Sequence, residues 1–218
     1  MAVLDPIKPT ILATRVIPNV DRSLGAKLEL RPDQRSVALV TCDIDDSLYV
    51  SLDEATKAAD VEVVYAHSFY AGSAHASGPL SGEIIGVLAA PDPAEARAGL
   101  AACIDYAENR AWFHAADPTG DLAFFAHPIA RIGSYLAREG GVPKGTSMAY
   151  LIAPPLEATF ALDAALKVAE VELAVWFAPP SETNFSGGYL VGEQSAVVAA
   201  CEAFRDAVVD VAATPREV

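Results

Sequence analysis

Residues 49–66, YVSLDEATKAADVEVVYA, recur 110 positions later as residues 159–176, TFALDAALKVAEVELAVW. In each stretch, apolar residues first follow helical spacing and then alternate or run together as they do in strands. At the constant offset the two stretches share apolar and charged residues alike: Leu52 and Leu162, Asp53 and Asp163, Ala55 and Ala165, Lys57 and Lys167, Ala59 and Ala169, Val61 and Val171, Glu62 and Glu172. We therefore predict an internal duplication of a helix followed by a strand.

The flanking segments continue the repeat in the same order. The strand-like runs VALVT (37–41) and MAYLI (148–152) precede the two stretches, and the apolar runs EIIGVLAA (83–90) and YLVGE (189–193) follow them. Helical patterns then occupy residues 93–111 and 194–212. Pro93 suits the first turn of its helix, and we place Asp53 and Asp163 at the starts of the two short helices, as caps.

This pattern predicts an α+β fold of two similar small domains, each a small antiparallel sheet flanked by helices. Turn-rich connectors, DPTGD (117–121) and EGGVPKG (139–145), lie between the repeats. We place the first domain at residues 1–115 and the second at residues 116–218.

Composition excludes several classes of protein. Of the 218 residues, 52% are hydrophobic and 20% are charged, which is too apolar for a disordered chain. The net charge of -14 disfavours nucleic acid and acidic membranes as partners. The N-terminus lacks a secretory segment, and no apolar run is long enough to span a bilayer, so we expect a cytoplasmic protein. Cys42, Cys103 and Cys201 are expected to be buried thiols.

No catalytic or cofactor-binding motif is recognisable, so we expect no enzyme, no cofactor and no metal site. The four histidines have no metal-ligand spacing. We expect His67 and His75 to be two ordinary loop residues in preference to forming a weak metal contact. The acidic run Asp43-Ile44-Asp45-Asp46 follows a strand, so we place it in a turn. Its carboxylates could be merely solvated, or they could attract a cation or an ammonium group.

Two polar loops, HSFYAGSAHASGPLSGE (67–83) and PPSETNFSGGY (179–189), occupy corresponding places in the repeats. Both are longer than a hairpin needs and rich in Gly, Ser and aromatic residues. Long loops in compact domains are usually functional or mobile. We therefore expect both loops to contribute to the function of the protein.

Five long segments resemble the EutL family of trimeric, tandem-domain shell proteins from ethanolamine-utilisation microcompartments. They cover most of the chain in order: residues 53–75, 91–100, 133–141, 148–167 and 179–192. The resemblance implies two permuted microcompartment domains per chain and a homotrimer shaped as a pseudo-hexameric tile. It also implies other shell proteins as partners, ethanolamine as a ligand, and a place in the microcompartment shell within the cytoplasm.

The resemblance also implies two kinds of pore. A gated central pore would be formed by loop residues Phe69, Tyr70, Ala71, Gly72, Ser73, His75, Glu182, Asn184 and Phe185. A small ethanolamine-binding pore in each subunit would be lined by Asp45, Asp46, Glu83, Phe113 and Thr183.

Two other functions remain open on the residues alone. Asp45, Asp46 and Glu83 could serve an enzyme as acid and base groups, although no nucleophile or metal motif accompanies them. The chain could also be a module that senses a small ammonium compound without joining a shell. A tile should associate in two dimensions, whereas an enzyme or sensor should stop at a closed oligomer.

Overall fold

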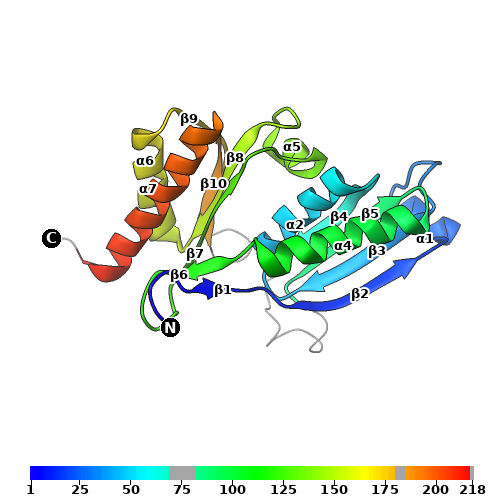
Figure 1. Cartoon of the computed structure of the whole chain (residues 1–218), viewed down its shortest axis with the longest axis horizontal. Helices are drawn as coiled ribbons and strands as arrows, with labels where there is room; N and C mark the ends of the chain where they lie inside the picture. The colour runs from blue at the N-terminus through cyan, green and yellow to red at the C-terminus, as the bar shows by residue number, and fades with distance from the viewer. Residues whose placement is uncertain (69–81, 180–184, 217–218) are drawn as a thin grey trace. The chain divides into compact units, whose positions relative to one another are not determined.

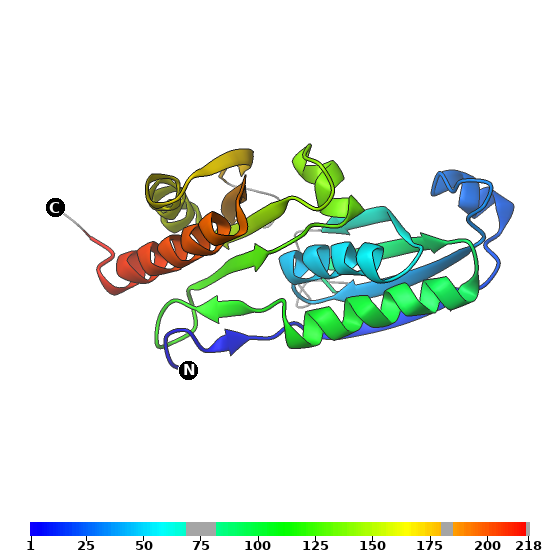
Figure 2. The same ribbon diagram turned by 45° about the horizontal axis from the view of Figure 1, so that its top comes forward.

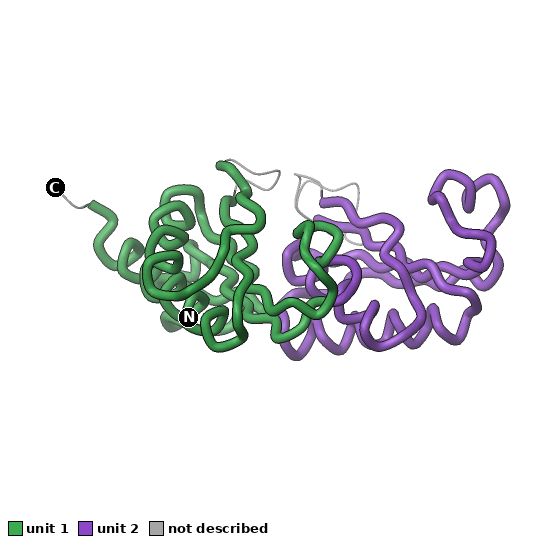
Figure 3. The backbone as a smooth tube through the Cα atoms, turned by 90° about the horizontal axis from the view of Figure 1, so that it is seen from above, with its two compact units in different colours: residues 1–7, 112–132, 137–218 green, residues 8–111, 133–136 purple. Residues whose placement is uncertain are grey.

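The computed structural model describes residues 1–68, 82–179 and 185–216 (Figure 1). The chain divides into two compact units (Figure 3). Unit 1 contains residues 1–7, 112–132 and 137–218, and unit 2 contains residues 8–111 and 133–136. The predicted domain boundary between residues 115 and 116 stays a prediction, and the units are defined here by their internal contacts.

Unit 2 is a four-stranded antiparallel sheet with strand order β2-β3-β5-β4. Helices α2 and α4 contact each other and pack against this sheet (Figure 2). Its elements are β2 (Ile11–Ile17), α1 (Arg22–Lys27), β3 (Ser36–Cys42), α2 (Asp45–Ala58), β4 (Glu62–Ser68), β5 (Ile84–Ala90) and α4 (Pro93–Asn109).

Unit 1 has a six-stranded antiparallel sheet with strand order β1-β6-β7-β8-β10-β9. Helices α6 and α7 pack against each other and against this sheet. Its elements are β1 (Pro6–Ile7), β6 (Phe113–Ala115), β7 (Ala123–Ile129), β8 (Ser147–Ala153), α6 (Pro155–Val168), β9 (Val171–Phe177), β10 (Ser186–Gly192) and α7 (Gln194–Ala213). Helix α5 (Ser134–Gly140) begins among the residues of unit 2 and ends among those of unit 1.

The predicted duplication is confirmed by the order of the elements. The series β2-α1-β3-α2-β4-β5-α4 in the first half of the chain returns as β7-α5-β8-α6-β9-β10-α7 in the second. Pro93 lies in the first turn of α4 as predicted, after the N-cap Asp92, whose side chain accepts hydrogen bonds from the backbone of Ala94 and Glu95. The three cysteines are buried and free, also as predicted.

The predicted starts of the two short helices are wrong. Helix α2 begins at Asp45 and α6 at Pro155, so Asp53 and Asp163 lie inside their helices and cap neither start. Two acids in the first turn of α2 and a proline in the first turn of α6 are the local features that favour these earlier starts.

Each unit has its own apolar core, most of which lies where its two long helices cover the sheet. In unit 2, a smaller cluster that includes Val37, Val87 and Ala89 lies on the opposite face. In unit 2, Leu48 and Leu52 of α2 are fully buried. In unit 1, Phe124, Leu151, Leu190 and Phe204 belong to one buried cluster that joins the sheet to α6 and α7. No helix in the described part of the chain is both long and apolar enough to cross a bilayer.

Candidate functional site

The acidic run lies between the end of β3 and the first turn of α2. The backbone N–H of Thr10 donates a hydrogen bond of 2.6 Å to Oδ1 of Asp43, which fixes this carboxylate beside the start of β2. Asp45 and Asp46 are the first two residues of α2, and both are buried in the isolated chain, with 7% and 6% of their surface exposed. The predicted turn is therefore wrong for these two, because the positive end of a helix dipole favours carboxylates in the first turn.

Glu83 lies close to the same place. Its backbone N–H donates a 2.8 Å hydrogen bond to the carbonyl of Cys42, the last residue of β3. The preceding Gly82 has a φ of +70°, and a Cβ there would lie 2.5 Å from the same carbonyl oxygen, so the close approach requires glycine.

Burial raises the pKa of the Glu83 carboxyl, and the charges of Asp45 and Asp43 raise it further. We call Asp43, Asp45, Asp46 and Glu83 the acidic cluster. The structure thus brings three of the predicted pore residues, Asp45, Asp46 and Glu83, into one region of unit 2.

Tyr49 adds an aromatic ring to this region, which sequence reasoning missed. It follows Asp45 and Asp46 by one helical turn on α2. Its hydroxyl donates a 3.1 Å hydrogen bond to Oγ of Ser68 and accepts one of 3.0 Å from the Ser68 backbone. Burial raises the pKa of Tyr49 to about 12, and the charges of Asp45 and Asp46 contribute to the rise. The helical spacing of Tyr49 from the two acids was the signal that could have indicated it.

Phe113, the predicted aromatic of the small pore, lies in unit 1 on β6. It is buried and stacks on Phe125 of β7, with ring centroids 5.1 Å apart. The ring of Phe185 meets it edge-on at 6.1 Å. Phe113 is therefore part of an aromatic cluster within unit 1, and its place beside the acidic cluster of unit 2 stays a prediction.

That aromatic cluster continues across the sheet of unit 1. Phe125 meets Tyr150 of β8, and Tyr150 meets Tyr189 of β10, both in edge-to-face contacts. Edge-to-face contact is one of the two favoured geometries for neighbouring rings, the other being offset stacking. The alternation of these positions with core residues such as Phe124 and Leu151 places the rings on the face of the sheet opposite to α6 and α7.

Most of the predicted gate residues lie outside the described residues. These are Phe69, Tyr70, Ala71, Gly72, Ser73, His75, Glu182 and Asn184, together with Thr183 of the predicted small pore. Of the two loop histidines, His67 is described: it ends up exposed on β4, with its ring 6.2 Å from that of Tyr65.

Relatives that resemble this chain over its full length decide the family. No protein-family model matches the chain. The microcompartment shell protein EutL of Clostridium perfringens is 51% identical over 97% of this chain and 97% of its own length. The EutL shell protein of Escherichia coli is 51% identical over 99% of this chain and 98% of its own.

The chain belongs to the EutL family of bacterial microcompartment shell proteins.

Solved structures agree with this family. The crystal structure of the ethanolamine utilization protein EutL from Leptotrichia buccalis superposes with a TM-score of 0.97 at 51% identity and covers both chains completely. EtuB from Clostridium kluyveri matches with a TM-score of 0.77 at 22% identity, over 94% of this chain and 90% of its own, and shares the fold. The predicted tandem pair of permuted microcompartment domains is therefore confirmed.

Within this EutL-family fold, the acidic cluster is suited to hold a positively charged group. Clustered carboxylates attract cations. The described residues contain no group of three or more His, Cys, Asp and Glu side chains arranged to hold a metal ion.

Proposed function

We propose that this protein is a structural, non-enzymatic component of an ethanolamine-utilisation microcompartment shell in the cytoplasm. The observation that carries the proposal is identity of about half the residues, over nearly the whole chain, with proteins named as EutL shell proteins. Three copies form a pseudo-hexameric tile, and tiles associate with one another and with other shell proteins into a flat layer.

The tile acts as a selective gate in this proposal. The two polar loops from each chain, including Phe185, meet around a central pore that passes large metabolites or cofactors. A smaller pore in each subunit, lined by Asp45, Asp46, Glu83, Phe113 and Thr183, binds ethanolamine. The net charge of -14 supports traffic of cationic rather than anionic small molecules.

Electron microscopy of the purified, concentrated protein tests the shell role. We expect flat hexagonal layers of three-lobed tiles, because a shell tile must associate along its edges as well as around its centre. Discrete particles under all solution conditions would contradict the shell role and favour a free ethanolamine-binding module.

Replacing Asp45 and Asp46 together by alanine tests the small pore. We expect the variant to bind ethanolamine more weakly in isothermal titration calorimetry and to keep the oligomeric state of the unmodified protein. The physical reason is the loss of two carboxylates that would otherwise face an ammonium group. Asp105→Ala with Glu108→Ala is the matched control, since it removes the same charge from the exposed side of α4 in the same unit.

The pH dependence of binding has a definite sign. Burial raises the pKa of Glu83 above its ordinary value of 4.5, so this carboxylate takes up its proton earlier as the pH falls. Ethanolamine affinity should therefore decline while the pH is still above 4.5, and Glu83→Gln should remove that part of the decline.

For the variant with alanine at both Asp45 and Asp46, an affinity equal to that of the unmodified protein would refute the pore assignment.

A further inference from the structure

Unit 1 contains a cavity of 350 Å³ that the proposed shell function does not use. It lies between α7 and the part of the sheet formed by β7 and β6, together with the N-terminal segment, and all the residues that line it belong to unit 1. Its volume falls in the range of pockets that hold small molecules. The cavity is therefore a candidate site of its own, separate from the acidic cluster of unit 2.

Much of the cavity lining is apolar. Phe124, Ala126 and Pro128 alternate along β7 and therefore face the same side of the sheet. Val198 lines the cavity from α7 and is 37% exposed. An apolar group that entered the cavity would cover surface that now faces water, which favours its binding.

Leu4 adds to the apolar lining from the N-terminal segment. Its backbone has a φ of +70°, which is unfavourable for leucine. Two hydrogen bonds hold this conformation: the Leu4 N–H donates to the carbonyl of Ala115 at 2.8 Å, and the Ala115 N–H donates to the carbonyl of Asp5 at 3.0 Å. The fold thus keeps a leucine that is 45% exposed in the lining at the cost of backbone strain, as is common at ligand sites.

Three polar side chains also line the cavity: His114 of β6, and Glu202 and Arg205 of α7. Glu202 and Arg205 are three positions apart and so lie on one face of the helix. The ring of His114 lies beside that of Phe124, with centroids 5.9 Å apart. Burial lowers the pKa of His114 and the charge of Arg205 lowers it further, so the ring is mostly neutral at neutral pH.

These side chains retain hydrogen-bonding groups for a ligand. In the described part of the chain, the His114 ring and the Glu202 carboxylate have no hydrogen-bond partner. Arg205 donates a 2.8 Å hydrogen bond from Nε to Oδ1 of Asp206, and its Nη groups have no partner among the same residues. Donors and an acceptor therefore line an otherwise apolar cavity.

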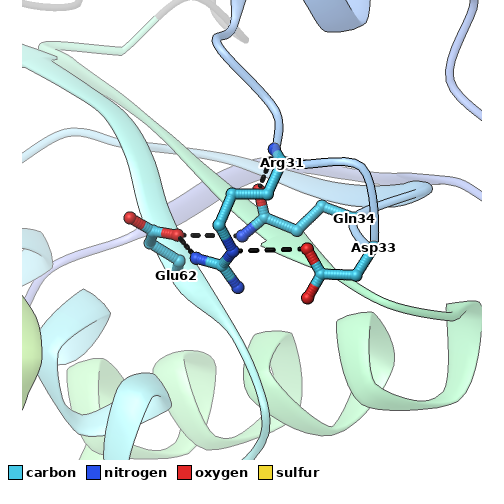
Figure 4. Close-up of polar contacts among 4 residues, drawn as sticks. All are labelled: Arg31, Asp33, Gln34 and Glu62. Atoms are coloured by element: carbon cyan, nitrogen blue, oxygen red, sulfur yellow. Dashed lines mark hydrogen bonds and ion pairs between the residues drawn. The ribbon is translucent and has the colours of Figure 1, made fainter.

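Glu202 and Arg205 form no ion pair with each other within the described residues, although both line the same cavity. Arg31 of unit 2, by contrast, pairs directly with both Asp33 and Glu62 (Figure 4). An acid and a base that lie side by side without pairing are placed to receive a ligand that carries one charge of each sign.

This polar pair is specific to the second repeat. Glu202 and Arg205 correspond to Ala101 and Ile104 of α4 at an offset of 101 residues. At this offset the five buried positions of the two helices coincide: Ala96 and Val197, Gly99 and Ala200, Leu100 and Cys201, Cys103 and Phe204, Ala107 and Val208. Strands β1 and β6 also have no counterpart in the four-stranded sheet of unit 2. The charged pair and the added strands thus occur together, in one repeat only.

We propose that this cavity binds a small zwitterion with an apolar side chain, the chemical class of leucine and similar α-amino acids. The ligand carboxylate accepts hydrogen bonds from Arg205 and His114, and the ligand ammonium group donates to Glu202. The ligand side chain packs against Phe124 and Val198. This binding site goes beyond the proposed shell role and does not depend on it.

The charges of the lining favour this class over simpler ligands. A carboxylic acid without an amino group places its carboxylate near Glu202, and an amine without a carboxyl group places its charge near Arg205. A zwitterion satisfies both side chains. It has no net charge, so the net charge of -14 on the chain does not repel it. The apolar lining in turn disfavours amino acids with charged side chains.

Isothermal titration calorimetry of the full-length protein with L-leucine tests the ligand class. We expect leucine to bind, and we expect 4-methylpentanoate and 3-methylbutylamine to bind about tenfold more weakly or worse, because each lacks one of the two charged groups. Ethanolamine should not displace leucine, since it has neither a carboxylate nor an apolar side chain. Absence of binding at ~10 mM leucine, equal binding of either analogue, or displacement by ethanolamine would overturn the proposal.

Single substitutions test the place of binding. Glu202→Gln and Arg205→Gln each remove a charge from a position that is not buried, so both variants should fold and should bind leucine about tenfold more weakly. Val198→Trp should abolish binding by filling the cavity. Asp210→Asn is the matched control: it removes a charge from an exposed position of α7 outside the lining and should leave the affinity unchanged. Charge variants that bind as tightly as this control would refute the assignment.

Methyl NMR of protein labelled at leucine and valine gives an independent readout. Added unlabelled leucine should shift the signals of Leu4 and Val198 and leave those of Leu48 and Leu52, on α2 of unit 2, unchanged. Shifts at Leu48 and Leu52 without shifts at Leu4 and Val198 would place the ligand in unit 2 and contradict the proposal. Layer formation tests the shell role separately, so either role can fail without the other.

Discussion

Asp53 illustrates how one buried carboxylate can join parts of the chain that are 80 residues apart. Its side chain is 1% exposed, and its two oxygens accept from Gly133 and Leu136. Lys57 stands 3.9 Å away and partly balances its charge. Asp163, at the same place in the second repeat, is 61% exposed at its side chain and forms an ion pair with Lys167. Identical residues at corresponding positions of the two repeats therefore have different structural roles, because their surroundings differ.

Replacing Asp53 by alanine should strongly destabilise the protein. It leaves two buried N–H donors without an acceptor, which costs about 2–4 kcal/mol in the free energy of unfolding. Asp163→Ala, the matched control, should change the same quantity by no more than ~0.5 kcal/mol, because an exposed ion pair contributes little. Urea denaturation of the two variants measures both, and similar losses in the two would contradict the role assigned to Asp53.

The pH dependence of stability offers a second check on Asp53. Burial raises the pKa of its carboxyl above the ordinary 3.8, so the native chain holds this proton more tightly than the unfolded chain does. The contribution of Asp53 to the free energy of unfolding therefore falls as the pH rises from 3.8 through the raised native pKa. Asp53→Ala should lack that fall.

At the scale of elements, the close approach of α2 to β5 depends on a missing side chain. A Cβ at Gly86 would lie 2.7 Å from a methyl group of Leu52. Leu52 is fully buried, so it has no room to move aside without disturbing the core of unit 2. A small residue on the sheet thus sets how closely the helix can pack.

A double-mutant cycle tests this contact. Gly86→Ala should cost about 1–3 kcal/mol through overpacking, and Leu52→Ala about 2–5 kcal/mol through the cavity that it leaves. The double variant should be less destabilised than the sum of the two, because the new methyl group fills part of the cavity. Chemical denaturation gives all four free energies, and simple additivity would show that the two side chains do not share this space.

At the scale of the whole molecule, the chain combines two self-contained cores with a large negative charge. Each unit buries its own apolar residues, so the fold within each unit does not require a partner chain. What remains exposed on unit 1 is concentrated on α6 and β9, including Leu156, Phe160, Val168 and Trp176. Apolar side chains gathered in this way are typical of protein–protein contacts. Any association of copies through these side chains would have to overcome the repulsion of their net charge.

The candidate site shows where sequence reasoning reached its limit. The acidic run and Glu83 were recognisable as candidates because acids stand out where apolar segments end. That Asp45 and Asp46 begin a helix, and that Tyr49 joins them, depends on how α2 packs on its sheet. The sequence pattern placed the helix start eight residues too late, since Asp53 resembles a cap when only its neighbours in sequence are considered.

By itself, the sequence determined the duplication, the order of the long strands and helices, the α+β class and the family. Hydrophobic periodicity and sequence similarity depend only on the order of residues along the chain. Only the tertiary structure decided that α2 is covered whereas α6 is exposed. It also decided that the Asp53 carboxylate accepts a hydrogen bond from Gly133 and that Leu52 packs directly on Gly86. These are contacts between residues distant in sequence. They arise from packing and burial, which can differ between two stretches of similar sequence.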